Sequence, residues 1–117
     1  MTRYEVTEAD TAIALGSGDV PVLATPRLVA WLEAATVEAA SSYTGPGRTT
    51  VGTAVRVAHR RPTFVGGTVT VEATLAGPPD GDRLRFLVRA VDAAGEVVGD
   101  GEVDRVIVDR DRFLRRP

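Results

Sequence analysis

The chain has 117 residues, of which 44% are hydrophobic and 26% charged, and its formal net charge is −2. This composition is typical of one globular domain, expected to span residues 1–117, and it does not indicate a nucleic-acid surface. Without cysteine and with a single histidine, the chain has no thiolate or multi-histidine metal site, so neither metal nor cofactor is expected. We find no signal peptide and no apolar run long enough to span a bilayer, which predicts a cytoplasmic protein without a membrane partner.

The first third of the chain predicts one strong helix. A short strand is expected over 3–7 and a helical turn near 12–15. Thr25 followed by Pro26 is typical of an N-cap and a first-turn proline, so the main helix is expected to begin there. It runs to about Ser42, where a glycine–proline–glycine sequence ends it.

After the helix, apolar and polar residues alternate with a period of two, which is typical of strands with one buried face. Strands are expected over about 51–60, 68–75, 83–90 and 96–109, with hairpin loops at 78–81 and 92–95. An antiparallel sheet with one polar face covers something on its other face, and the helix is the obvious candidate. The sequence therefore predicts an α+β fold.

Glu33 interrupts an apolar side of the predicted helix. At about 100° per residue it falls near Val29, Val37 and Ala40. A carboxylate among apolar side chains is costly unless it is paired or used, so we expect Glu33 to be largely buried and to face His59 or a ligand cavity. The alternative is a glutamate at the helix edge that reaches water or bonds to backbone.

His59, the only histidine, is expected to point inward. Strand alternation places it on one face with Val51, Thr53, Val55 and Val57, whereas Gly52 falls on the other face. The ordinary pKa of histidine lies near neutrality, which suits proton transfer. The alternative is a structural histidine at a strand end.

For Thr25 the alternative to a functional role is a structural one, because an N-cap position explains a threonine before proline without any further role. A hydroxyl at a helix N-terminus nevertheless lies where anionic groups are favoured.

In the last strand, Gly99-Asp100-Gly101 indicates a bulge or a close approach by another chain or ligand. Arg105 shares strand parity with Val103 and is expected to point inward. The basic tail 110–116 is expected to be solvated, with contact to a phosphate-bearing ligand as the alternative.

A helix followed by four long antiparallel strands resembles the hotdog fold. The resemblance becomes specific, over nearly the whole chain, to the fluoroacetyl-CoA thioesterase-like family. It rests on Ala24-Thr25, Glu33, Val51-Gly52-Thr53, His59, Pro62, Gly66, Thr68-Val69-Thr70, the stretch from Gly99 to Arg105, and Phe113.

The resemblance implies a set of site residues. In that family a threonine, a glutamate eight residues later and a histidine on the next strand form the catalytic set, which implies Thr25, Glu33 and His59 here. It also implies that the backbone amide of Gly52 holds the thioester carbonyl, and that Arg105 corresponds to the family's arginine near the chain end, a substrate-binding position.

The expected function is therefore hydrolysis of a small acyl-CoA thioester, with acyl-CoA as the substrate. Gly52 and Thr25 would donate hydrogen bonds to the oxyanion, Glu33 would act as base or nucleophile, and His59 would transfer protons. The resemblance also implies a homodimer that joins two sheets edge to edge near the active sites. Two alternatives remain open: a hotdog protein that binds acyl-CoA or another ligand without turnover, and a hotdog hydratase or dehydratase.

One segment departs from the family pattern. Fluoroacetyl-specific members carry aromatic lid residues just before the catalytic threonine, whereas residues 15–20 of this chain contain none. The resemblance therefore does not carry over a preference for the fluoroacetyl group.

Overall fold

The computed structural model describes residues 1–116, which form one antiparallel sheet and one long helix with two short ones. In chain order the elements are β1 (Thr2–Glu5), α1 (Ala12–Leu15), α2 (Thr25–Ala40), β2 (Arg48–His59), β3 (Thr68–Leu75), β4 (Arg83–Asp92), β5 (Val97–Asp109) and α3 (Arg110–Leu114). Short 3₁₀ turns precede α1 and follow α2. The expected α+β order of one main helix and four long strands is confirmed, and α3 was not expected from the sequence.

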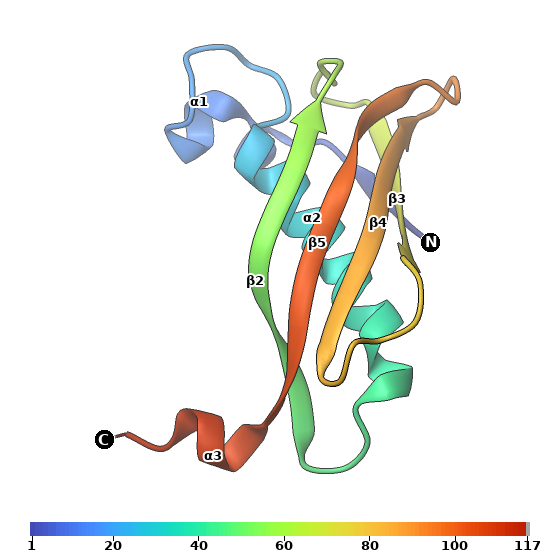
Figure 1. The fold of residues 1–117 in the computed structure, drawn as a ribbon. Coiled ribbons are helices and arrows are strands. Elements are labelled where there is room, and N and C mark those ends of the chain that lie inside the picture. Colours follow the sequence, from blue (N-terminus) through green and yellow to red (C-terminus); the bar gives the residue numbers. More distant parts are fainter. Residues whose placement is uncertain (117) are drawn as a thin grey trace.

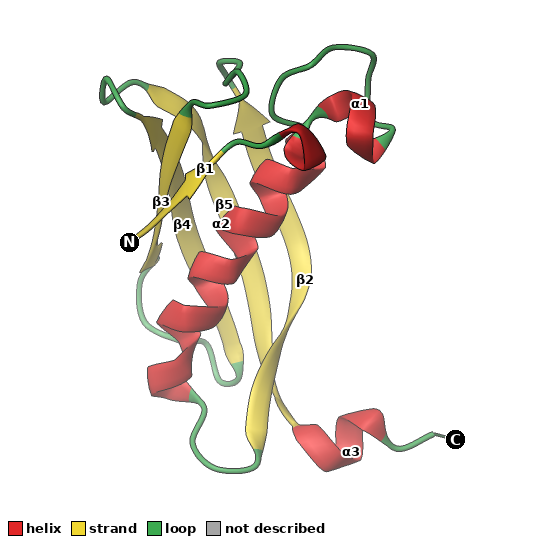
Figure 2. Ribbon diagram, turned by 180° about the vertical axis from the view of Figure 1, so that it is seen from behind, coloured by secondary structure: helices red, strands yellow, loops and turns green. Residues whose placement is uncertain are grey.

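The sheet is curved and wraps around one side of α2, as Figures 1 and 2 show from opposite sides. Its strand order is β1-β3-β4-β5-β2, and every neighbouring pair is antiparallel. The sheet therefore has two edges, the four-residue β1 and the twelve-residue β2. No helix within residues 1–116 is long and apolar enough to cross a membrane.

The core lies between α2 and the sheet. The buried residues of α2 are Leu28, Leu32, Thr36 and Ala40, at the spacing of one helical stripe. They pack against apolar side chains from the inner face of the sheet, including Val69, Val71, Phe86, Val98 and Val103. Each leucine that is fully buried in this way contributes about 2 kcal/mol of hydrophobic stabilisation.

The expectation that the Glu33 side of α2 is buried was wrong. Val37, on that side, is 50% exposed, and Glu33 is only partly covered. Apolar residues occur around most of the helix, so a helical wheel does not show which stripe meets the sheet. The leucine stripe fills the core, and the stripe of Val29, Glu33 and Val37 is left only partly covered.

The expected alternation in β2 fails at one point. The pairing with β5 shifts between Gly52 and Ala54, which leaves Thr53 as an extra residue in a bulge. Gly52 is therefore paired with Arg105 on the inner face, contrary to the sequence-based expectation. Val55, Val57 and His59 follow the bulge and keep the inward parity that was expected.

The close approach expected at residues 99–101 is made by the chain's own strand. Gly101 pairs with Val57, and a Cβ added there would collide with the carbonyl oxygen of Arg56. A Cβ at Gly99 would lie 3.0 Å from the carbonyl oxygen of Ala58. The two glycines thus let β5 approach the end of β2 that carries His59.

Candidate active site

The hydroxyl of Thr25 and the ring of His59 are joined by a hydrogen bond, with 2.8 Å between Oγ1 and Nδ1. Thr25 is the first residue of α2, and the N-cap position is taken by Ala24. The expectation that Thr25 is the N-cap was therefore wrong. Because its side chain does not cap the helix, its hydroxyl is available to the imidazole at the end of β2.

His59 is half-buried, and burial is the main reason why its pKa lies below the ordinary value of 6.5. A backbone contact with Arg61 opposes this lowering of the pKa. The second ring nitrogen, Nε2, is buried and has no hydrogen-bond partner within residues 1–116. Buried ring nitrogens are normally paired, so the unpaired Nε2 marks His59 as a candidate functional residue.

Thr25 and His59 both line a cleft of about 330 Å³ at one end of the molecule. Its other walls come from α1, from the loop that follows α1 and from the residues after β2, with Ala12, Val20 and Leu23 as apolar lining. Arg60 and Arg61 also lie at this cleft. The cleft therefore combines an apolar lining with a hydroxyl, an imidazole and two arginines, which pair with Asp100 and Glu96.

A second cluster lies farther along α2 and centres on Arg105. The guanidinium is buried, with 7% of the side chain exposed. Its Nε donates to Oγ1 of Thr50 at 2.8 Å, and Nη2 donates to the Thr50 carbonyl at 3.2 Å. Nη1 lies 3.4 Å from both Oε2 of Glu33 and Oγ1 of Thr36. The inward orientation expected for Arg105 is confirmed.

Glu33 is held by this arginine rather than by His59. Its side chain is 37% exposed, so the expectation that it is largely buried was wrong. The carboxylate lies directly against the backbone of Gly52, where an added Cβ would be 2.7 Å from Oε2 and 3.4 Å from Nη1 of Arg105. Only a glycine leaves room for the carboxylate in this position. Glu33 thus combines a buried counter-ion on one side with access to solvent on the other.

The structure brings the sequence-predicted residues together in two groups, not one. Thr25 contacts His59, and Glu33 contacts Gly52 and Arg105. Thr25 and Glu33 are eight residues apart on α2, which corresponds to about 12 Å along the helix axis. The two groups are therefore separate within one copy of the chain.

Sequence reasoning missed Thr36 and Thr50, which position the Arg105 guanidinium. A signal was present, because an arginine with inward strand parity requires acceptors on the elements that face it. Which threonines supply them depends on the helix–sheet packing. Within residues 1–116 there is no group of three or more histidine, aspartate or glutamate side chains that could hold a metal ion.

A larger cleft, of about 560 Å³, lies beside the β3–β4 loop and includes outward-facing residues of the sheet. Two of its charged side chains are paired with each other, since Arg85 binds Asp104 with 2.9 Å between Nε and Oδ1. The smaller cleft at Thr25 and His59 is the better candidate site, because it carries an unpaired buried ring nitrogen.

Comparison with known proteins identifies the family of this chain. The family model described as fluoroacetyl-CoA-specific thioesterase matches residues 6–111. A fluoroacetyl-CoA thioesterase from Streptantibioticus cattleyicolor is 38% identical over 92 residues, which make up 79% of this chain. The match spans 65% of that relative's length, slightly less than two thirds.

Solved structures agree with the sequence match. A variant of the fluoroacetyl-CoA-specific thioesterase FlK, solved in complex with fluoroacetate and CoA, superposes with a TM-score of 0.85 at 32% identity. The superposition covers 96% of this chain and 93% of that one. A hot-dog-like protein from Thermanaerovibrio acidaminovorans superposes with a TM-score of 0.84 at 23% identity. That superposition covers 96% of this chain and 82% of the other, and the likeness shows the fold alone. The chain has the hotdog fold and belongs to the fluoroacetyl-CoA-specific thioesterase family.

Proposed function

We propose that this protein hydrolyses a small acyl-CoA thioester to the free acid and CoA. The observation that carries the proposal is the carboxylate of Glu33, held by buried Arg105 against the backbone of Gly52. A thioester carbonyl at this point would meet a backbone amide as hydrogen-bond donor and a carboxylate as base. The family match supports the same chemistry.

The two separated groups of residues would form one site in a homodimer. The edge strand β2 leaves one row of backbone groups unpaired, and exposed strand edges favour pairing with another chain. In an antiparallel pair related by a two-fold axis, the first half of β2 lies beside the second half of its copy. Gly52 is in the first half and His59 at the end, so Glu33 of one copy approaches the Thr25–His59 pair of the other.

The proposed reaction uses both groups of residues. Glu33 removes a proton from water, and the hydroxide attacks the thioester carbonyl, whose oxyanion accepts hydrogen bonds from the amide of Gly52 and the hydroxyl of Thr25. The C–S bond then breaks. The proton passes from Glu33 to His59, whose imidazolium gives it to the leaving thiolate. Direct attack by Glu33, followed by hydrolysis of the resulting anhydride, uses the same residues.

Incubation with short acyl-CoAs and a thiol reagent tests the proposed activity. Release of free CoA by the unmodified protein is the expected result. Acyl-CoA that is bound but stays intact would instead identify a binding protein, and a changed acyl double bond would identify a hydratase or dehydratase.

Assembly provides a separate prediction. Light scattering at micromolar concentration should give the mass of a dimer. Val55, which is 40% exposed on β2, would lie in the proposed seam, so Val55→Lys should produce a monomer with little activity. Leu87→Lys is the matched control, because Leu87 is exposed on β4 but away from the β2 edge. An unmodified protein that is monomeric and fully active would refute the shared site.

The close contact between Gly52 and Glu33 predicts the effect of one added methyl group. In Gly52→Ala the new Cβ would displace the carboxylate, and turnover should fall about tenfold or more, because small misplacements of a catalytic group are costly. The melting temperature should stay the same or rise, since alanine is preferred to glycine within a strand. Ala58→Ser adds one atom at an exposed position of the same strand and serves as the control. Full activity in Gly52→Ala would place the reacting carbonyl elsewhere.

The loop at residues 16–19 predicts the acyl selectivity. It is small and polar, and it lies at the cleft where fluoroacetyl-specific members are expected to carry aromatic residues. One missing apolar contact changes discrimination by about 1–3 kcal/mol. We therefore expect similar kcat/KM values for fluoroacetyl-CoA and acetyl-CoA, and tolerance of somewhat longer acyl chains. A large ratio in favour of fluoroacetyl-CoA would show that selectivity arises elsewhere in the pocket.

A further inference from the structure

We propose that the C-terminal segment 110–116 of one subunit lies beside the Thr25–His59 cleft of the other, where its arginines bind the phosphate groups of CoA. The inference rests on the proposed function and on the β2-to-β2 dimer. It assigns a substrate-binding role to a segment outside the Thr25, Glu33 and His59 set.

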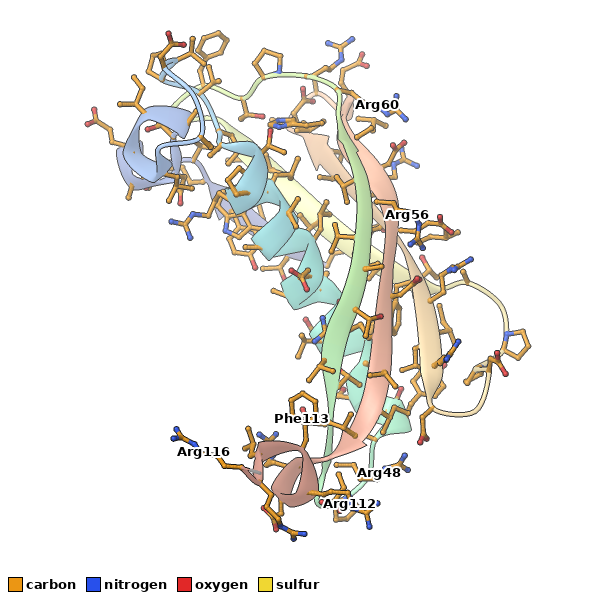
Figure 3. The ribbon with its side chains drawn as sticks, turned by 60° about the vertical axis from the view of Figure 1, so that its left-hand side comes forward. Arg48, Arg56, Arg60, Arg112, Phe113 and Arg116 are labelled. Carbon is orange, nitrogen blue, oxygen red and sulfur yellow. The ribbon has the colours of Figure 1, made fainter. Side chains whose placement is uncertain are left out.

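The segment is attached at one end of the free edge. Arg48, the first residue of β2, pairs with Asp109, and the amide of Arg110 donates to the carbonyl of Gly47 at 3.0 Å. From this point α3 projects past the edge of the sheet, at the end opposite α1 (Figures 1 and 2). Figure 3 shows α3, with Phe113 and Arg116, on the same side of the sheet as α2.

In the proposed dimer, a two-fold axis at the β2 edge places α3 of one subunit beside the Thr25–His59 cleft of the other. Antiparallel pairing places the Arg48 end of one β2 beside the His59 end of the other, and a continuous sheet keeps both α2 helices on the same side. The α3 helix that projects past one edge then lies next to α1 and the Thr25–His59 cleft of the second subunit. This geometry requires only that most of the two β2 strands overlap.

Exposed apolar side chains at both ends support this contact. On α3, Phe113 is 55% exposed and Leu114 is 67% exposed. At the cleft end, Ile13, Leu15 and Val20 are also exposed. The two-fold arrangement brings the apolar side chains of α3 against those at the cleft end of the other subunit. Each group would then shield the other from water, which contacts both in a single chain.

The charge of the segment identifies the ligand chemistry. Arg110, Arg112, Arg115 and Arg116 are accompanied by one acid, Asp111, although the whole chain has a net charge of −2. All four arginines are exposed, and none forms an ion pair with a carboxylate within residues 1–116. Guanidinium groups bind phosphate oxygens through two parallel hydrogen bonds. The diphosphate and 3′-phosphate of CoA supply such oxygens. In the proposed dimer the segment would also lie near Arg60 and Arg61 of the cleft, which pair with Asp100 and Glu96 within their own chain.

A comparison of two substrates tests the phosphate contact. We expect Arg115→Gln/Arg116→Gln to raise the KM for acetyl-CoA about tenfold with kcat unchanged, and to leave the KM for the N-acetylcysteamine thioester, which has no phosphate, unchanged. The CoA effect should shrink as salt is added. The control Arg3→Gln/Arg89→Gln removes the same charge at exposed positions on β1 and β4 and should alter neither KM.

The outcomes separate the inference from the function on which it rests. Equal KM values for acetyl-CoA before and after the substitution, or equal changes for both thioesters, would overturn the phosphate contact while the hydrolase stands. If the unmodified protein hydrolyses neither thioester, the proposed function is wrong, and the inference fails with it.

Cross-linking tests whether the contact is made between subunits. The chain has no cysteine, so Arg115→Cys/Val20→Cys introduces the only two thiols. Within one copy these positions lie near opposite ends of β2, roughly 35 Å apart at the rise of a strand. A bismaleimide should therefore give a covalent dimer. Arg115→Cys/Thr74→Cys, with the second thiol on β3, is the control. Cross-linking no better than in the control would overturn the placement.

Discussion

Replacing Glu33 by glutamine is expected to lower turnover by about a hundredfold or more while the fold is retained. Glutamine has nearly the same shape as glutamate but lacks the basic oxygen that would accept a proton from water. Arg105 keeps its hydrogen bonds to Thr50 and Thr36, so the guanidinium remains satisfied by three other acceptors. The measurement is kcat for acetyl-CoA, together with thermal unfolding of the same preparation.

Glu38→Gln provides the matched control for this substitution. Glu38 lies on the same helix and is exposed, with no ion pair to an arginine within residues 1–116. The substitution removes the same charge from the last turn of α2, away from Gly52 and Arg105, so the variant should retain wild-type kcat. Near-normal hydrolysis by well-folded Glu33→Gln would remove the carboxylate from the mechanism.

His59→Ala should also lower turnover by about a hundredfold, and by much more than it lowers stability. The substitution removes the proton-transfer group, a contribution that is typically worth 10²–10⁴-fold in rate. The structural loss is one hydrogen bond to Thr25, worth about 1 kcal/mol, because His59 is only half-buried. Specific activity per folded molecule is the deciding measurement. Unfolding with intact specific activity would identify His59 as a structural residue.

Thr25→Val tests whether the Thr25 hydroxyl and the His59 imidazole contribute to turnover jointly or independently. If the hydroxyl and the imidazole work together through their hydrogen bond, the double substitution Thr25→Val/His59→Ala should be little slower than His59→Ala alone. Independent roles would instead give multiplied losses. The free energies of unfolding of the two single variants and the double variant report the contribution of the hydrogen bond to stability separately.

The lowered pKa of His59 adds a pH signature to the same variant. The unfolded chain binds a proton at the ordinary pKa of 6.5, whereas the folded chain binds it only at lower pH. Between these two values the unfolded state carries more protons, so the free energy of unfolding falls as the pH drops below about 6.5 and levels off below the lowered pKa. In His59→Ala this part of the pH dependence should be absent.

The sequence predicted the elements of this fold well because their signals are local. The alternation of side chains, the turn residues at 78–81 and 92–95, and Pro26 near the helix start all act within a few residues. The family resemblance, which depends on motif order, was confirmed by the match over residues 6–111. The inward orientation of Arg105 was also predicted, because no bulge interrupts its alternation with Val103 and Ile107.

The sequence by itself determined the order of the elements, the family and the residue types from which a site is built. Only the tertiary structure decided their contacts. Ala24 takes the N-cap position, so the Thr25 hydroxyl is available to bond to His59. The bulge at Thr53 turns Gly52 toward Glu33. Arg105 holds Glu33 at a point about 12 Å along α2 from Thr25. The reason is physical: strand register, bulges and the choice of the buried helix stripe depend on packing between distant residues, which local periodicity does not encode.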